Sequence, residues 1–114
     1  MKRDLNQFPD DENGDVLWNM HSDGDNLATP REVDFSVIFP TEEAALQFAV
    51  LMLKNDQKVS FSAYDGNAEL PWQVQAHPVM EPNHENISGY ESQLAEDAAR
   101  YGGRNDGWGA MQQD

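Results

Sequence analysis

The strongest constraint on the fold is the stretch from Val33 to Lys54, which joins a strand pattern to a helix pattern through one proline. Its first part alternates apolar and polar residues, so an extended backbone sends the two kinds of side chain to opposite faces. The apolar positions are Val33, Phe35, Val37 and Phe39. This alternation predicts a half-buried strand.

The second part of the stretch predicts a helix that begins at about Glu42. Pro40 cannot donate to a strand ladder, Thr41 is a good N-cap, and the acidic residues that follow suit the first turn of a helix. Between Ala44 and Leu53 the only polar side chain is Gln47. The apolar arc is therefore about twice the roughly 100° that a helix on a one-sided sheet needs. We expect something besides the sheet to cover part of this helix.

The borders of that wide arc are occupied by Val50 and Leu51. We expect the sheet to cover the opposite side, which is centred on Ala45 and Met52 and joined by Phe48 and Ala49. The N-terminal segment is the other apolar stretch available, so we predict that it docks against this helix. If it does not, Val50 or Leu51 becomes the better candidate for a partner surface.

The N-terminal segment Asp15–Ser22 is ambiguous, because its apolar residues fit one face of a helix or one face of a strand. We favour a short helix that is capped by Asp15 and ended by Gly24. Residues 1–13 are polar and acidic and show no periodicity, which is typical of a flexible tail. We therefore expect one domain over residues 14–112, preceded by this tail.

The rest of the chain contains two more strands, a second helix and a short last strand. Lys58–Tyr64 and Trp72–His77 alternate and form a predicted hairpin, whose inward residues are Val59, Phe61, Ala63, Trp72, Val74 and Ala76. Asn83 is the expected N-cap of the second helix, and Gly102 with Gly103 ends it. The apolar stripe of this helix is Ile87, Tyr90, Leu94, Ala98 and Tyr101. Asn105–Met111 is the candidate last strand.

After the N-terminal helix, the order of elements is βαββαβ. This order predicts an α+β, ferredoxin-like sandwich, in which two helices cover one face of an antiparallel sheet.

Composition argues against several classes of function. The 114 residues carry 21 acidic and 7 basic side chains, with a net charge of −14 and no basic segment, which opposes direct binding of nucleic acid. The acidity suits solubility or attraction to a basic partner. The chain has no cysteine, which suits a reducing cytoplasm, and no apolar stretch long enough to span a membrane. We expect a cytoplasmic protein.

The sequence offers no recognisable catalytic or cofactor motif. His21, His77 and His84 are too scattered for a metal motif, and the common nucleophile, phosphate-loop and dinucleotide patterns are missing. We therefore expect no enzyme activity, no cofactor and no metal site. An alternative is a small-molecule cleft on the open sheet face beside Tyr64, Gln75 and His77. Self-association through the open sheet or the first helix of the sandwich is a further possibility.

Three landmarks carry a resemblance to a known family. The run from Tyr101 to Gly109 contains the element Asp106-Gly107-Trp108-Gly109 after an amphipathic helix. Residues 30–35, with the exit through Phe39 and Pro40, and residues 82–87 are the other two. Together they resemble the regulator of ribonuclease E activity B family, the ribonuclease E inhibitor B proteins.

The resemblance implies a small, acidic, ferredoxin-like bacterial protein that binds ribonuclease E in its non-catalytic scaffold region. Such a protein changes RNA decay by protein contact, without catalysis and without a cofactor. The partner-binding residues expected from the sequence are Val50, Leu51, Asp106, Gly107 and Trp108. For Trp108 two roles stay open, a core residue held between two glycines or an exposed anchor for a partner.

Overall fold

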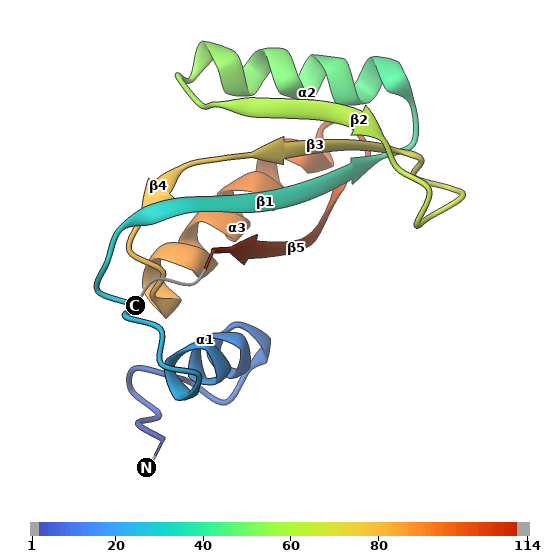
Figure 1. Cartoon of the computed structure of the whole chain (residues 1–114). Helices are drawn as coiled ribbons and strands as arrows, with labels where there is room; N and C mark the ends of the chain where they lie inside the picture. Colours follow the sequence, from blue (N-terminus) through green and yellow to red (C-terminus); the bar gives the residue numbers. More distant parts are fainter. Residues whose placement is uncertain (1–2, 112–114) are drawn as a thin grey trace.

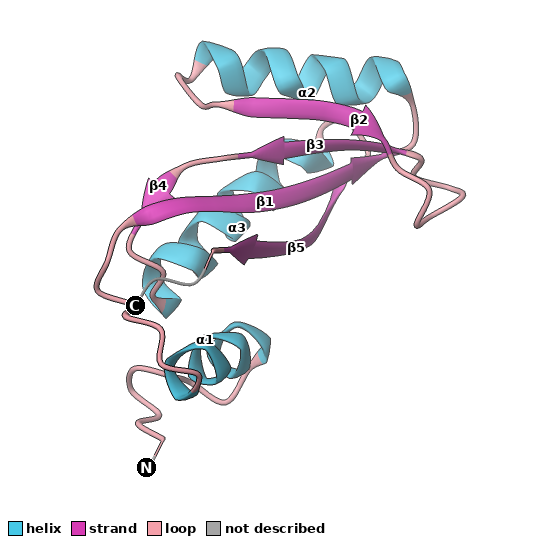
Figure 2. Cartoon of the chain, in the orientation of Figure 1, coloured by secondary structure: helices cyan, strands magenta, loops and turns pink. Residues whose placement is uncertain are grey.

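The computed structural model describes residues 3–111 as an α+β protein with three helices and an open antiparallel sheet of five strands (Figures 1 and 2). The helices are α1 (Glu12–Ser22), α2 (Glu42–Lys54) and α3 (His84–Ala99). The strands are β1 (Arg31–Phe39), β2 (Val59–Ala63), β3 (Trp72–Ala76), β4 (Val79–Met80) and β5 (Arg104–Ala110). Among these residues, no helix is both long and apolar enough to cross a membrane.

The strand β1 is the centre of the sheet. It pairs with β3 through Phe35 and Ala76, and with β5 through Phe35 and Trp108, while β2 pairs with the outer side of β3. The pairing of Arg31 with Met80 in β4 continues the register of β1 with β3, so β4 extends that ladder beyond Pro78. The hairpin of β2 and β3 was predicted, whereas β4 was not.

The predicted strand-to-helix unit is confirmed. The alternate side chains of β1 that begin at Val33 are buried, and Thr41 caps α2 by accepting a hydrogen bond from the Ala44 N–H. The buried residues of α2 are Ala45, Phe48, Ala49 and Met52, as expected. The stripe of α3 completes the core on the same face of the sheet, with Ile87, Leu94 and Ala98 fully or almost fully buried. In β2, Phe61 and Ala63 stay exposed, because this strand lies at the sheet edge.

The expected docking of the N-terminal segment on the first helix of the sandwich, α2, is wrong. Residues 12–22 form a helix, as favoured, but α1 packs against α3 at the far side of the molecule from α2 (Figure 1). The helix also starts earlier than predicted, because Asp11 rather than Asp15 is its N-cap and accepts a hydrogen bond from the Gly14 N–H.

Residues before α1 fold back on that helix. Phe8 is 2% exposed and its ring lies 5.4 Å from the Trp18 ring. The Arg3 guanidinium donates to the backbone carbonyls of Phe8 and Pro9. These contacts give residues 3–9 a defined position beside α1.

Candidate functional site

A broad groove runs along the solvent-facing side of α2. Its volume is about 750 Å³, and Tyr101, which follows α3, forms part of its wall. Val50 and Leu51 both line the groove, as do Glu42, Glu43, Leu46, Gln47 and Lys54. The two α2 residues expected to contact a partner are thus in one groove.

The groove is apolar because α2 has more apolar surface than the sheet can cover. Leu46 and Val50, which line the groove, are 44% and 49% exposed, although each would be favoured in a core. Leu53, on the same helix but outside the groove lining, is 57% exposed. Apolar side chains gathered on one exposed face mark an interaction site more often than scattered ones do. Glu42 and Glu43 add negative charge at the start of the helix.

A second cavity, of about 420 Å³, lies between α1, α3 and β5. Asp106, Gly107 and Trp108 all line it, together with Glu12, Asn13, Val16, Glu91 and Asn105. Three of these lining residues are acidic and none is basic. The cavity therefore favours a positively charged group, such as an arginine or lysine side chain of a partner.

Trp108 joins the core to the N-terminal helix. Its ring is partly buried against the core, and its Nε1–H donates to Asn13 Oδ1 at 3.0 Å. The Asn13 amide in turn donates to Ser88 Oγ at 3.1 Å and to Glu91 Oε1 at 2.7 Å. This network gives Trp108 a packing role, and its contact with a partner stays a prediction.

The five expected partner-binding residues therefore do not form one surface. Val50 and Leu51 line the groove on α2, whereas Asp106, Gly107 and Trp108, from β5, line the cavity beside α1. Figure 1 shows α2 and α1 at opposite ends of the molecule.

The open face of the sheet carries a network of hydrogen bonds. Gln75 Nε2–H donates to Ser36 Oγ at 3.1 Å, and His77 lies between Asp34 and Ser60. Tyr64 does not belong to this network. Its hydroxyl donates a hydrogen bond to the Asp106 carboxylate, which raises the pKa of Tyr64. Tyr64, Gln75 and His77 line neither the α2 groove nor the cavity between α1, α3 and β5. The small-molecule cleft stays a prediction.

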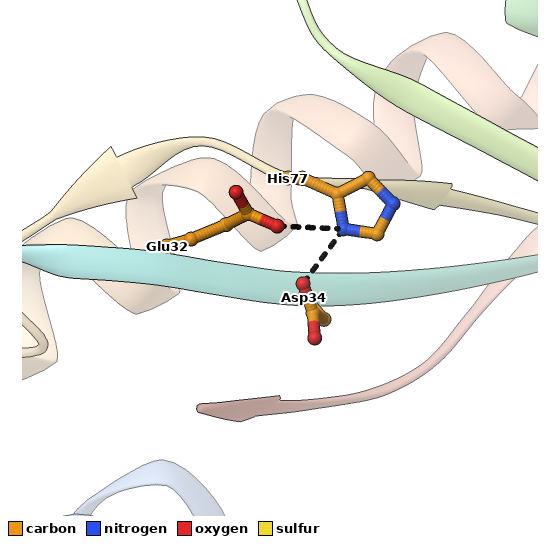
Figure 3. A group of neighbouring side chains, drawn as sticks. All are labelled: Glu32, Asp34 and His77. Carbon is orange, nitrogen blue, oxygen red and sulfur yellow. Dashed lines mark hydrogen bonds and ion pairs between the residues drawn. The ribbon is translucent and has the colours of Figure 1, made fainter. Parts of the chain in front are cut away.

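His77 belongs to a group that sequence reasoning missed. Glu32, Asp34 and His77 each turn a side chain toward the same point on the open face (Figure 3). The two acidic residues share one face of β1, and the observed register places His77 opposite Asp34. Aligning the predicted strands against each other would have brought the three together, whereas motif spacing could not.

Comparison with known proteins identifies a family for almost the whole chain. The family model described as "Regulator of ribonuclease activity B" matches residues 10–110. No curated protein matches the chain.

Proposed function

The chain belongs to the regulator of ribonuclease activity B family, and from this premise we propose that it is a non-catalytic regulator that binds ribonuclease E. Binding would change RNA decay by contact between proteins, with no reaction carried out by this chain. Membership of the family implies regulation of ribonuclease activity, and our proposal adds that ribonuclease E is the partner.

The observation that carries the proposal is the exposed apolar groove on α2. A groove that leaves Leu46 and Val50 in solvent gains stability when a partner covers them, at about 25 cal/mol for each Å² of apolar surface buried. Glu42 and Glu43 beside the groove favour a partner segment that combines apolar with basic residues. The net charge of −14 supports the same choice of partner.

Three further assignments belong to the proposal. We assign the sandwich to the ferredoxin-like class. The assignment is supported by the order β1-α2-β2-β3-α3-β5, in which the short β4 extends the ladder of β3, and by the position of β1 between β3 and β5. We place the protein in the cytoplasm, where ribonuclease E would be met. The division into a tail of residues 1–13 and a domain of residues 14–112 stays a prediction. The burial of Phe8 favours a domain that starts before residue 14.

The test is a pull-down of ribonuclease E, with and without its scaffold half, by the full chain in low salt. We expect retention of the form that contains the scaffold. Val50→Asp, which places a charge in the groove, should abolish it. The matched control is Val79→Asp, since Val79 is also an exposed valine but lies in β4, away from the groove. Equal retention by the two variants, or no retention by the natural chain, would contradict the proposal.

Self-association through the same groove is the second candidate, since a second copy could also cover Leu46 and Val50. Sedimentation at micromolar concentration distinguishes the two. A single 12.8 kDa species would exclude self-association at that concentration. A dimer that Val50→Asp dissociates would favour it.

A further inference from the structure

The open face of the sheet holds two carboxylates and an imidazole at one point. Glu32 and Asp34 are two residues apart on β1, so their side chains leave the same face of the sheet. His77 follows β3 directly, and the pairing of Phe35 with Ala76 puts it opposite Asp34. Figure 3 shows His77 Nδ1 directed toward oxygens of both carboxylates.

The distances suit a small cation. His77 Nδ1 lies 2.6 Å from Asp34 Oδ1 and 3.7 Å from Glu32 Oε1, and one donor atom from each residue lies within 4.8 Å of the others. Donors bound tetrahedrally to zinc at about 2.0–2.2 Å stand roughly 3.3 Å apart. Small side-chain rotations would therefore bring the three donors to coordinating positions, and water would complete the shell.

Ser60 orients the imidazole from the other side. Its Oγ lies 2.9 Å from His77 Nε2, and the His77 side chain is only 12% exposed. Without an ion, Nδ1–H donates to Asp34 Oδ1, and the Ser60 hydroxyl can donate to Nε2. When an ion replaces the Nδ1 proton, Nε2–H donates to Ser60 and the lone pair of Nδ1 faces the ion. Histidine ligands of metal ions commonly donate their second ring N–H in this way, which fixes both the tautomer and the ring orientation.

Lys58 is the competing cation. Its Nζ lies 3.0 Å from Glu32 Oε2, whereas the other oxygen of Glu32 faces His77. Because the Lys58 side chain is 69% exposed, it can move away or stay on Oε2 while Oε1 binds the ion. Asp34 and Glu32 are 48% and 44% exposed, so an ion can enter from solvent.

We propose that Glu32, Asp34 and His77 form a binding site for a divalent transition-metal ion of the zinc type. One imidazole nitrogen and two carboxylate oxygens form a donor set that such ions accept, whereas magnesium and calcium prefer oxygen alone. The site does not depend on the α2 groove, so its test is independent of ribonuclease binding.

The test is calorimetric titration of the full chain with zinc chloride. We expect one equivalent to bind, and His77→Gln or Asp34→Asn to weaken the affinity at least about tenfold. The control is His84→Gln, because His84 also lies beside a carboxylate, Asp11, but outside the site. This variant should bind like the natural chain. Lys58→Met should bind zinc more tightly, since it removes the competing charge.

A second measurement needs no substitution. Zinc added to the natural chain should shift the imidazole NMR signals of His77 at one equivalent and leave those of His21 and His84 in place. Equal binding by the natural chain and His77→Gln would overturn the proposal, because the ion would then be bound by exposed carboxylates elsewhere on the surface. Absence of binding, or equal shifts at all three histidines, would also overturn it.

Discussion

Arg31 and Asp25 carry opposite charges in the interior of the protein. Their side chains are 4% and 1% exposed, and Arg31 Nη1 donates to both oxygens of Asp25 at 2.8 Å. The same guanidinium donates to the backbone carbonyls of Asn26, Thr29 and Met111. The pair therefore fastens the loop before β1 to the chain that follows β5.

We expect Asp25→Asn to destabilise the fold by about 3 to 5 kcal/mol, because it leaves the Arg31 charge buried without its counter-ion. Urea denaturation at neutral pH measures the change. Glu96→Gln is the control, since Glu96 is an exposed carboxylate on α3 and its loss should cost little. A cost as small for Asp25→Asn as for the control would contradict the burial of the pair.

The carboxyl group of Asp11, the N-cap of α1, makes the stability of the fold depend on pH. The hydrogen bond from the Gly14 N–H, and then the one with His84, hold the pKa of Asp11 below its ordinary value of 3.8. A carboxyl group with a lowered folded pKa stabilises the fold above its unfolded pKa and loses this contribution as the pH falls through the folded pKa. Asparagine can still cap the helix but does not titrate.

We therefore expect the natural chain to be more stable than Asp11→Asn at pH 7, and the difference to shrink as the pH falls below 3.8. Chemical denaturation across this range is the measurement. Asp10→Asn, one residue before the cap, is the control: it removes the same charge without changing the cap, and it should leave the stability at pH 7 close to that of the natural chain. A difference that stays constant with pH would show that the Asp11 charge does not stabilise the fold.

The residues before α1 pack closely against that helix at one glycine, Gly14. A Cβ atom at Gly14 would lie 1.8 Å from the Pro9 carbonyl oxygen, whereas one at Gly89 in α3 would meet nothing within 4 Å. Both residues lie inside helices, where alanine is ordinarily favoured over glycine by about 1 kcal/mol. The two positions therefore form a matched pair.

Gly89→Ala should raise the free energy of unfolding by about 0.5 to 1 kcal/mol, the usual gain for alanine in a helix. Gly14→Ala should lower it, because the new methyl group displaces Pro9 and with it the buried Phe8. Thermal melting compares them, and amide hydrogen exchange in α1 locates the damage. If both variants gain stability, the segment before α1 does not hold the position described.

At the scale of elements, the sequence predicts the features that local signals determine, namely the helix caps and the buried positions of a helix. Thr41 and Asn83 cap the helices that they were expected to cap, and the buried positions of α2 follow from its apolar arc. The N-terminal helix was misplaced, because its partner is chosen by long-range hydrogen bonds from Asn13 to Ser88 and Glu91. Neither these bonds nor the meeting of Glu32 with His77 leaves any local pattern in the sequence.

At the scale of the whole molecule, the net charge of −14 should raise the association rate with a basic partner. We expect the association rate with ribonuclease E to fall about tenfold or more between low and high salt, because salt screens charges over roughly 10 Å. Stopped-flow mixing measures this rate. Val50→Asp should act mainly on the dissociation rate, since the groove contact forms after encounter. An association rate that does not change with salt would exclude steering by charge.

The central position of β1 also governs how the chain must be made. On the ribosome β1 emerges before its partners, because Ala76 and Trp108 lie 41 and 73 residues after Phe35. Until they emerge, a strand with apolar residues at Val33, Phe35 and Val37 has two unpaired edges. Such segments are prone to aggregate during synthesis. The strand β1 therefore gains both of its partners only after β5 has been translated.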